Sequence, residues 1–515
     1  MTEVAPHTAR ARHDVVVVGG GGAGLAAAIE AATAGASVLV LEAADELLGS
    51  TGRSVGSIAA SRTPDQRRLG IDDSPEDHLR DYRTLSGPLA AQEDPALVAL
   101  LVDNVTATLA WLRSLGMEFF GPVGEAPHSA PRLHNILPGS RSYIHHLARA
   151  ARRAGVRVHT GVRVSALVLD EDGRRVIGVH GEGRGGAREY LARRAVVLAS
   201  GDFSASTTMK RERISDLVAG FRPVNPHALG DGQRMAEAAG AVVLNAHVFD
   251  VPSMRLAPPP AQGLYGLLQS VPPVRPLARL IQGGLRHLPP AVVRPLMMGF
   301  VTTFLSPREA MFTDGAILVD RDGQLRSEGG ENVNLSVAAL GEAGGFLIGD
   351  HALFRRYNAE PHHVATAPGV AHAYMADFRR SRPDVYSQAS TLDELAAKLG
   401  VPAAALAASV TRANEAKRAE GRPELAEGPY FALGPLQAYL IQTNGGLAVD
   451  TTLAVRHRAG GTIAGLFAAG NAGQGGLALF GHGHHLGWAF TSGRLAGRHA
   501  ARHPRWDDHH EREPS

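Results

Sequence analysis

A strand, a glycine-rich turn, a helix, a second strand and an acid follow one another near the start of this 515-residue chain. The β-branched run Val15–Val18 predicts a buried parallel strand. Gly19, Gly21 and Gly24 follow in GxGxxG order, an alanine-rich stretch predicts a helix, and Ser37–Leu41 predicts the second strand. Because this is the order of a dinucleotide-binding βαβ unit, the sequence predicts an α/β fold with a Rossmann-type domain.

The glycines and the acid each have a physical role in such a unit. Gly19 permits the tight turn, Gly21 lets a pyrophosphate approach the backbone, and Gly24 lets the helix pack closely on the strand. The helix N-terminus offers N–H groups and positive dipole to the phosphates. Glu42 can accept hydrogen bonds from ribose hydroxyls, which favours FAD or NAD over NADP. The alternative is a tight turn in an unrelated α/β fold, because glycine-rich turns are common.

Composition narrows the class of protein. Hydrophobic residues make up 44% of the chain and charged residues 20%, as in an ordinary soluble globular protein. The formal net charge of +2 is too small to indicate a nucleic-acid partner. The chain has no cysteine, which excludes disulfides, a cysteinyl flavin, a CxxCH haem site and a cysteine-ligated iron–sulfur cluster.

Neither a signal peptide nor a membrane-spanning helix is predicted. Residues 1–14 contain no apolar stretch, and the chain has no run of about 18 apolar residues. We therefore expect a cytoplasmic protein. The polar segment from Arg498 onwards predicts a frayed end, with residues 504–515 as a disordered tail.

Signals for nucleotide binding recur at both ends of the chain. The residues from Glu42 to Thr63 are rich in glycine and hydroxyl groups, which suits contact with phosphate or a flavin ring. Ala195–Ser204 and Thr462–Asn471 each predict a buried strand that ends in glycine-containing sequence. The length of the chain favours two domains. We expect residues 1–205 and 436–503 to form one domain, interrupted by an α+β cap domain at residues 206–435.

One stretch of the middle region has an unusual charge. Between Val251 and Arg308 there are six arginines among Pro, Leu, Val and aromatic residues, and no Asp or Glu. This composition suits a peripheral membrane contact or a patch for an apolar ligand. The alternative is an ordinary lid of the cap domain, because proline recurs too often for one amphipathic helix.

Several blocks of the sequence resemble one superfamily of flavoenzymes. They are VVVVGGGGAGLAAA, AVVLASGDFS, LGDGQRMAEAAGA, and the C-terminal group GGLAVDTTLAV, IAGLFAAGN and LGWAFTSGRLAG. With them the chain resembles, over nearly its full length, the FAD-dependent fumarate reductase and 3-ketosteroid dehydrogenase superfamily. The resemblance implies a Rossmann-type FAD-binding domain interrupted by a cap domain, with substrate held between cap and flavin.

The resemblance also indicates how FAD is bound. The LGWAFTSG helix resembles the one whose N-terminus faces the flavin N1/O2 edge, where its dipole would stabilise the anionic reduced flavin. No His follows Gly49, where some relatives attach flavin covalently, so we expect non-covalent FAD. The residues expected to bind FAD are Gly19, Gly21, Ala23, Gly24, Glu42, Ala43, Ser50, Thr51, Gly56, Val164, Ser200, Gly201, Gly470, Asn471, Leu486, Gly487 and Trp488.

The segment LFGHGHHLGWA places the chain nearer the ketosteroid dehydrogenase branch. Fumarate reductases carry an Arg in a GANRLGGNA-like segment that clamps a substrate carboxylate, and no Arg stands here, so dicarboxylate reduction is not expected. Gly481, Gly483 and Gly487 match the glycines of the ketosteroid dehydrogenase pattern YPGPGATIG. Leu479, however, occupies the Tyr position, and LRSEGGENVN lacks the cap-domain Tyr of the pattern RFxNExxPY.

The candidate catalytic groups lie in the same segment. His482 and His484 are the candidates for acid and base, ahead of His485, because imidazole titrates near neutral pH. The N–H of Gly483 is the expected donor to the substrate carbonyl, and Tyr430 is a secondary candidate. We expect no metal site, because HGHH has no adjoining acid or cysteine.

The sequence therefore predicts an FAD-dependent enzyme that acts on a C–C bond next to a carbonyl, as in desaturation of a small, apolar cyclic ketone. One alternative is an ene-reductase of the fumarate reductase type acting on an enone or enoate. Another is a flavin-bound electron-transfer or sensor protein. The electron acceptor stays open.

Overall fold

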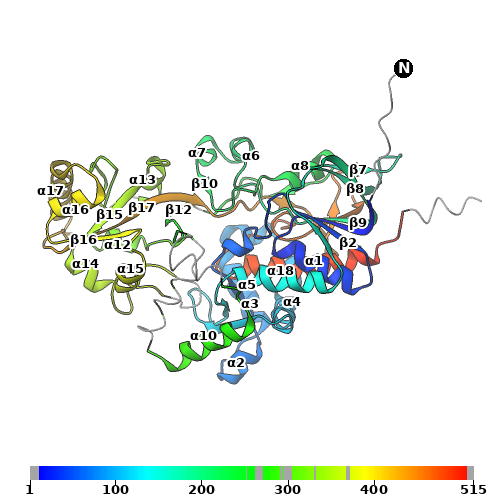
Figure 1. Cartoon of the computed structure of the whole chain (residues 1–515), viewed down its shortest axis with the longest axis horizontal. Helices are drawn as coiled ribbons and strands as arrows, with labels where there is room; N and C mark the ends of the chain where they lie inside the picture. Colours follow the sequence, from blue (N-terminus) through cyan, green and yellow to red (C-terminus); the bar gives the residue numbers. More distant parts are fainter. Residues whose placement is uncertain are drawn as a thin grey trace, which may run out of the picture. The chain divides into compact units, whose positions relative to one another are not determined.

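The computed structural model describes residues 11–250, 252–260, 271–289, 294, 298, 304–329, 332–366 and 372–506. The chain divides into two compact units, both drawn in Figure 1. Unit 1 consists of Met1–Ala219, Asn225–Phe249 and Gln442–Ser515. Unit 2 consists of Gly220–Val224 and Asp250–Ile441. The class is α/β, as the sequence predicts.

An eight-stranded sheet forms the core of unit 1. Strands β20, β9, β1, β2 and β6 lie side by side in parallel, while β19, β8 and β7 extend the sheet in antiparallel pairs. Val15–Val18 of β1 are fully or nearly fully buried, which a strand covered on both faces requires. The strands are β1 (Ala11–Val18), β2 (Val38–Leu41), β6 (Arg157–His159), β7 (Arg163–Leu169), β8 (Val176–Gly183), β9 (Gly186–Leu198), β19 (Ala454–Arg456) and β20 (Thr462–Ala468).

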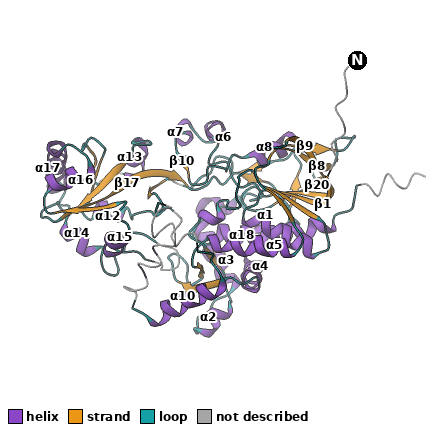
Figure 2. Cartoon of the chain, in the orientation of Figure 1, coloured by secondary structure: helices purple, strands orange, loops and turns teal. Residues whose placement is uncertain are grey.

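Helices α1, α5 and α18 lie next to one another beside this sheet (Figure 2). Small residues allow α1 and α18 to approach closely. A Cβ at Gly493 would come 2.3 Å from the carbonyl oxygen of Ala23, and one at Gly497 would come 2.1 Å from that of Ala27. The helices of unit 1 are α1 (Gly22–Thr33), η1 (Thr51–Arg53), α2 (Pro64–Arg68), α3 (Pro75–Ser86), η2 (Gly87–Ala91), α4 (Pro95–Ser114), α5 (Arg141–Arg153), α6 (Thr207–Arg213), α7 (Asp216–Ala219), α8 (Asp231–Ala238) and α18 (His484–Arg502).

Two small sheets complete unit 1. One has the order β3–β5–β4, and the other pairs β11 with β18. These strands are β3 (Ser57–Ala59), β4 (Glu118–Val123), β5 (Leu133–Leu137), β11 (Val243–Leu244) and β18 (Gly446–Leu447).

Unit 2 is built on a seven-stranded sheet around the long strand β17. The order is β10–β17–β15–β13–β14, with β12 and β16 also paired to β17. The strands are β10 (Arg222–Pro223), β12 (Ser253–Leu256), β13 (Ile317–Val319), β14 (Leu325–Ser327), β15 (Gly345–Gly349), β16 (Tyr386–Ala389) and β17 (Tyr430–Leu440). The helices are α10 (Arg275–His287), α12 (Ala310–Thr313), α13 (Val333–Ala339), α14 (His351–Arg356), α15 (Met375–Ser381), α16 (Leu392–Leu399) and α17 (Ala403–Ala419).

The boundaries of unit 2 differ from the expected cap at residues 206–435. Residues 206–219 and 225–249 belong to unit 1. The reason is local packing, since α8 contacts β7 and β11 pairs with β18, and all four elements lie in unit 1.

The expectation of a frayed end from Arg498 is wrong for the residues described. Helix α18 continues to Arg502. Beyond it, the backbone N–H of Trp506 donates to the carbonyl of Arg193, and its indole N–H donates to that of Ala192. Residues 507–515 of the expected tail lie outside the described residues.

Within the part of the chain that the structure describes, one helix, α4, is long and apolar enough to cross a membrane by length and composition alone. It contacts α3 and α18, and side chains such as Leu101, Val105 and Leu112 are buried in the core of unit 1. The core of a globular unit accounts for its apolar character.

Candidate active site

A cavity of about 550 Å³ opens at the carboxyl ends of β1 and β2 in unit 1. This edge of a parallel sheet is where doubly wound folds bind nucleotides. Twelve of the residues expected to bind FAD line it: Gly19, Gly21, Ala23, Glu42, Ala43, Ser50, Thr51, Val164, Ser200, Gly201, Gly470 and Asn471. The described structure thus brings together residues from four distant parts of the chain.

Backbone sterics shape the wall of this cavity. Gly19 has φ +106°, and a Cβ there would come 2.4 Å from the carbonyl oxygen of Ala199. A Cβ at Gly24 would come 1.9 Å from the carbonyl oxygen of Gly19, so only glycine lets α1 approach β1 this closely. A Cβ at Gly21 would meet nothing nearer than Gly49 at 4.0 Å, which leaves open space above the first turn of α1.

Hydrogen bonds fix the polar part of the wall. The carboxylate of Glu42 accepts from the backbone N–H of Gly20 at 2.7 Å and from that of Ala44 at 2.8 Å. The Thr51 hydroxyl accepts from the N–H of Gly22 at 3.1 Å. Each carboxylate oxygen of Glu42 retains a second lone pair for a ribose hydroxyl.

The wall also offers a polar atom without a protein partner. The Ser200 hydroxyl oxygen is buried and has no hydrogen-bond partner in the described structure, although Ser200 lines the cavity. A buried hydroxyl left in this way indicates a missing ligand atom or water. With the glycine wall, Glu42 and the N-terminus of α1, the residues present fit the dinucleotide portion of FAD.

Five residues expected to bind FAD lie elsewhere than in the cavity lining. Gly24 packs against β1, as described above. Gly56 packs against Ile136 and accepts at its carbonyl from the Tyr143 hydroxyl at 3.0 Å. The side chain of Trp488 is fully buried and its indole donates to the carbonyl of Gly473 at 3.3 Å. The remaining two are Leu486, which packs on the core of unit 1, and Gly487, which lies against Val105 of α4. The residue of α18 that lines the cavity is Ala489, which directly follows Trp488.

Two segments of unit 1, residues 124–132 and 480–485, bring together a second group of polar side chains and are called the paired loops below. The second segment includes the first two residues of α18. His482 contacts the carboxylate of Glu125, with 2.6 Å between Nδ1 and Oε1. The His482 side chain is 44% exposed. Since a carboxylate only accepts hydrogen bonds, Nδ1 carries the proton and Nε2 is the basic nitrogen of the neutral ring.

His484 is in a different environment. It is 1% exposed, and burial lowers its pKa to about 3. Its Nδ1–H donates to the carbonyl of Phe480 at 2.7 Å, because a carbonyl can only accept. Its Nε2 must then accept from Nε2–H of His78, 3.1 Å away. Both nitrogens of His484 are therefore engaged within the protein, in a neutral ring.

Two other imidazoles lie next to His484, of which His78 is buried and His128 is half-buried. His78, on α3, stacks on it with ring centroids 5.3 Å apart, and the ring of His128 lies 5.4 Å away. Burial, together with His484, lowers the pKa of His78 well below its ordinary value. Burial and Arg132 lower the pKa of His128. We call His78, His128 and His484 the imidazole cluster.

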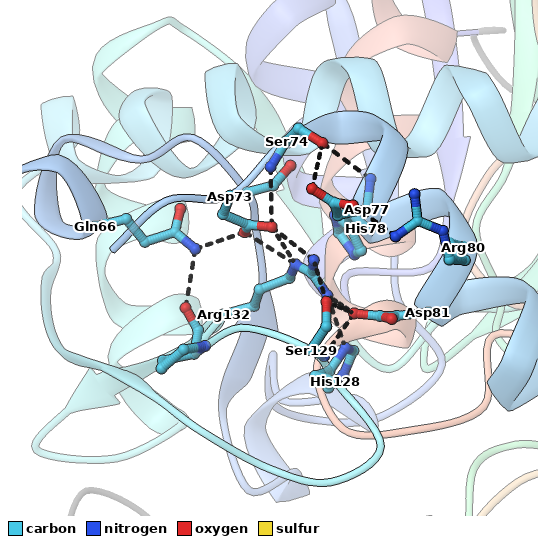
Figure 3. Close-up of polar contacts among 12 residues, drawn as sticks. Gln66, Asp73, Ser74, Asp77, His78, Arg80, Asp81, His128, Ser129 and Arg132 are labelled. Atoms are coloured by element: carbon cyan, nitrogen blue, oxygen red, sulfur yellow. Dashed lines mark hydrogen bonds and ion pairs between the residues drawn. The ribbon is translucent and has the colours of Figure 1, made fainter. Parts of the chain in front are cut away.

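An ion-pair network supports this cluster (Figure 3). Arg132 is fully buried, and its guanidinium lies between the carboxylates of Asp73 and Asp81. The contact to Asp73 is 2.6 Å. Its NH1 group also lies 3.4 Å from Nδ1 of His128. The network ties α3 to the loop that carries Glu125 and His128.

The other two catalytic candidates have clear structural positions. Gly483 is the N-cap of α18 with φ +94°, and a Cβ there would come 2.3 Å from the backbone N of Ala59 on β3. Tyr430 begins β17 in unit 2 and packs against the apolar core of that unit. Burial, with Asp350 and Glu427, raises its pKa.

Several of these polar residues could not be selected from the sequence. Glu125, His78, His128 and Arg132 stand in segments without a motif, and only their meeting with the 480–485 loop distinguishes them. Among the described residues, no group of three or more histidines and carboxylates is arranged to hold a metal ion.

Comparison with known proteins identifies the family. The family model for the FAD binding domain matches residues 14–270 and 288–483. Fumarate reductase (cytochrome) of Shewanella frigidimarina is 27% identical over 513 residues, which cover 95% of this chain and 77% of that protein. The 4-oxocyclohexanecarboxylate 2-dehydrogenase of Sinomonas cyclohexanicum is 27% identical, with 95% and 93% covered.

A solved structure agrees with these relatives. The 3-ketosteroid-Δ4-(5α)-dehydrogenase of Rhodococcus jostii RHA1, in complex with 4-androstene-3,17-dione, aligns with a TM-score of 0.59 and 26% identity. The alignment covers 95% of this chain and 97% of that chain. The chain therefore belongs to the FAD binding domain family, as an FAD-dependent oxidoreductase of the fumarate reductase and 3-ketosteroid dehydrogenase superfamily.

Proposed function

We propose that this FAD-dependent oxidoreductase, which acts on CH–CH bonds, dehydrogenates a small, largely apolar cyclic ketone next to its carbonyl. The observation that carries the proposal is the Glu125–His482 pair at the start of α18. An imidazole oriented by a carboxylate is suited to accept a proton from a carbon made acidic by a carbonyl.

The paired loops supply the groups that such a reaction needs. Bound FAD would take a hydride equivalent from the β-carbon of the ketone. Nε2 of His482 would accept the α-proton, while Glu125 holds the ring and stabilises its protonated form. N–H groups in the first turn of α18, beginning at Gly483, have no acceptor within the helix and favour negative charge on the carbonyl oxygen.

His484 has a different part in this proposal. Both ring nitrogens of His484 are hydrogen-bonded within the protein, and burial lowers its pKa to about 3. The neutral ring therefore cannot exchange a proton at neutral pH. We therefore assign it a positioning role, holding the loop from Phe480 to His482 against α3.

The names of similar proteins support a cyclic ketone as the substrate. One relative is named a 4-oxocyclohexanecarboxylate 2-dehydrogenase, and the similar solved structure is a 3-ketosteroid dehydrogenase with a steroid dione. In this chain no Lys or Arg occurs from Leu479 to Gly493. A ketone needs no cationic clamp there, whereas a dicarboxylate does.

A second candidate is the reverse reaction, reduction of an enone or enoate. The observation in its favour is the 27% identity to a fumarate reductase along 95% of the chain. The same groups would serve, with His482 donating rather than accepting the proton.

Anaerobic mixing of the purified, FAD-loaded protein with substrates tests both directions. We expect 4-oxocyclohexanecarboxylate or 4-androstene-3,17-dione to bleach the oxidised flavin. Chemically reduced protein is mixed in parallel with enones and with fumarate. Fast reoxidation by an enone or by fumarate, without bleaching by any ketone, would establish the reductase alternative. No reaction in either direction would favour the electron-transfer or sensor alternative.

A further inference from the structure

The positive segment from Val251 to Arg308 has no part in the proposed reaction. It contains six arginines and no aspartate or glutamate. Its described residues belong to unit 2 and include the helix α10. Arg294 lies 3.7 Å from the carboxylate of Asp377, whereas Arg275 and Arg279 are exposed on α10. Exposed positive charge of this kind attracts anionic surfaces.

Helix α10 has an inner and an outer face. Ala278 and Ile281 are 2% and 4% exposed, and they anchor the inner face. Arg279 and Leu280 are exposed on the opposite side, and Arg275 is exposed at the edge between the two faces. Because successive helical residues are rotated by about 100°, Arg279 and Leu280 project from the two sides of the outer face.

The outer face combines positive charge with exposed apolar groups. Leu280 is 74% exposed, more than any other large hydrophobic side chain in the described part of the chain. Leu288, directly after the helix, is 51% exposed. Single exposed leucines are common, but Leu280 on the helix and Leu288 at its end lie close in sequence to exposed arginines, which is a pattern of interfacial segments.

We propose that the outer face of α10 docks the protein on an anionic lipid surface. The helix lies along the surface, Leu280 and Leu288 enter the boundary between headgroups and acyl chains, and Arg275 and Arg279 contact lipid phosphates. Each basic side chain close to such a surface strengthens binding about fivefold. The phosphates of a nucleic acid could bind the arginines, but a nucleic acid has no apolar phase in which the leucines could be buried. An anionic lipid surface therefore fits this face better. This inference does not depend on the proposed substrate.

Flotation of the FAD-loaded, full-length protein with lipid vesicles tests the proposal. One vesicle set is phosphatidylcholine alone, and the other contains phosphatidylglycerol as well. We expect binding to the anionic vesicles only, and weakening by added salt. Arg279→Glu should lower the partition coefficient about 25-fold, because it reverses one charge. Leu280→Asp should lower it about tenfold or more.

Leu217→Asp is the matched control. Leu217 is 63% exposed on α7, outside the positive segment, and its substitution should leave vesicle binding unchanged. Flavin absorbance and the thermal unfolding midpoint show that each variant is folded. The proposal is overturned if the wild-type protein stays free of anionic vesicles. Equal binding to neutral vesicles, or an equal loss in Leu217→Asp, overturns it as well.

Discussion

The FAD cavity and the imidazole cluster both lie in unit 1, but they are built by opposite means. Backbone shape makes the cavity, since Gly19 and Gly24 tolerate approaches that a side chain would block. Buried polar side chains make the cluster, and an ion-pair network around Arg132 holds it. FAD binding in the cavity should therefore be sensitive to added side-chain volume. The stability conferred by the cluster should be sensitive to lost or added charge. Each prediction below acts on one of the two.

The largest expected effect is on the ion-pair network. Arg132→Met leaves Asp73 and Asp81 buried without their cation, which should lower the free energy of unfolding of unit 1 by about 3–5 kcal/mol. Urea unfolding followed by far-ultraviolet circular dichroism measures the loss.

Arg211→Met is the control for this change. It removes an ion pair to Asp216 in which the arginine side chain is 57% exposed, and such a pair is worth about 1 kcal/mol or less. Equal losses in the two variants would contradict the structural role given to Arg132.

The second effect is on the cavity. A Cβ at Gly24 would come 1.9 Å from the carbonyl oxygen of Gly19, so Gly24→Ala must shift α1 away from β1 at a cost of about 1–3 kcal/mol. We expect the purified variant to hold far less FAD, measured as the ratio of flavin to protein absorbance. Gly283→Ala, on α10 with no atom near its Cβ, should retain FAD fully. Full FAD occupancy in Gly24→Ala would refute the steric account of the turn.

The sequence allowed the cavity to be predicted much further than the cluster. Gly19, Gly21 and Glu42 lie within one βαβ unit and line the cavity, so their spacing alone places them around a nucleotide.

The cluster could not be predicted, because its members are far apart in sequence. His78, His128 and His484 meet only in the folded chain, and burial rather than residue type lowers their pKa values. The HGHH motif indicates the loop that carries His482 and His484. It could not distinguish the exposed His482 from the buried His484.

The third effect is a pH dependence of stability that comes from the cluster. The pKa of His484 is about 3 in the folded protein and about 6.5 when unfolded, so the unfolded chain takes up the proton first. The stability that this group contributes is complete above about pH 6.5 and falls as pH drops towards 3, by about 1.4 kcal/mol per pH unit. His78, whose pKa is also lowered by burial, adds to the slope.

Thermal unfolding between pH 7.5 and 5 measures this dependence. The double variant His78→Leu with His484→Phe should show a shallower slope, because it removes both buried imidazoles. His247→Gln changes an exposed histidine of unit 1 that lies apart from the cluster in sequence, and it should keep the wild-type slope. A wild-type midpoint that is flat over this range would contradict the buried, neutral state of the cluster.

The most direct test of the account is the rate of flavin reduction by a cyclic ketone in a single anaerobic turnover. We expect His482→Gln to slow this step about 100-fold, the scale of losing a general base, and Glu125→Gln to slow it about tenfold. FAD content should be unchanged in both, and His351→Gln, at an exposed histidine of α14, should react as the wild type does. A wild-type rate in His482→Gln would remove the Glu125–His482 pair from the mechanism and contradict the central claim.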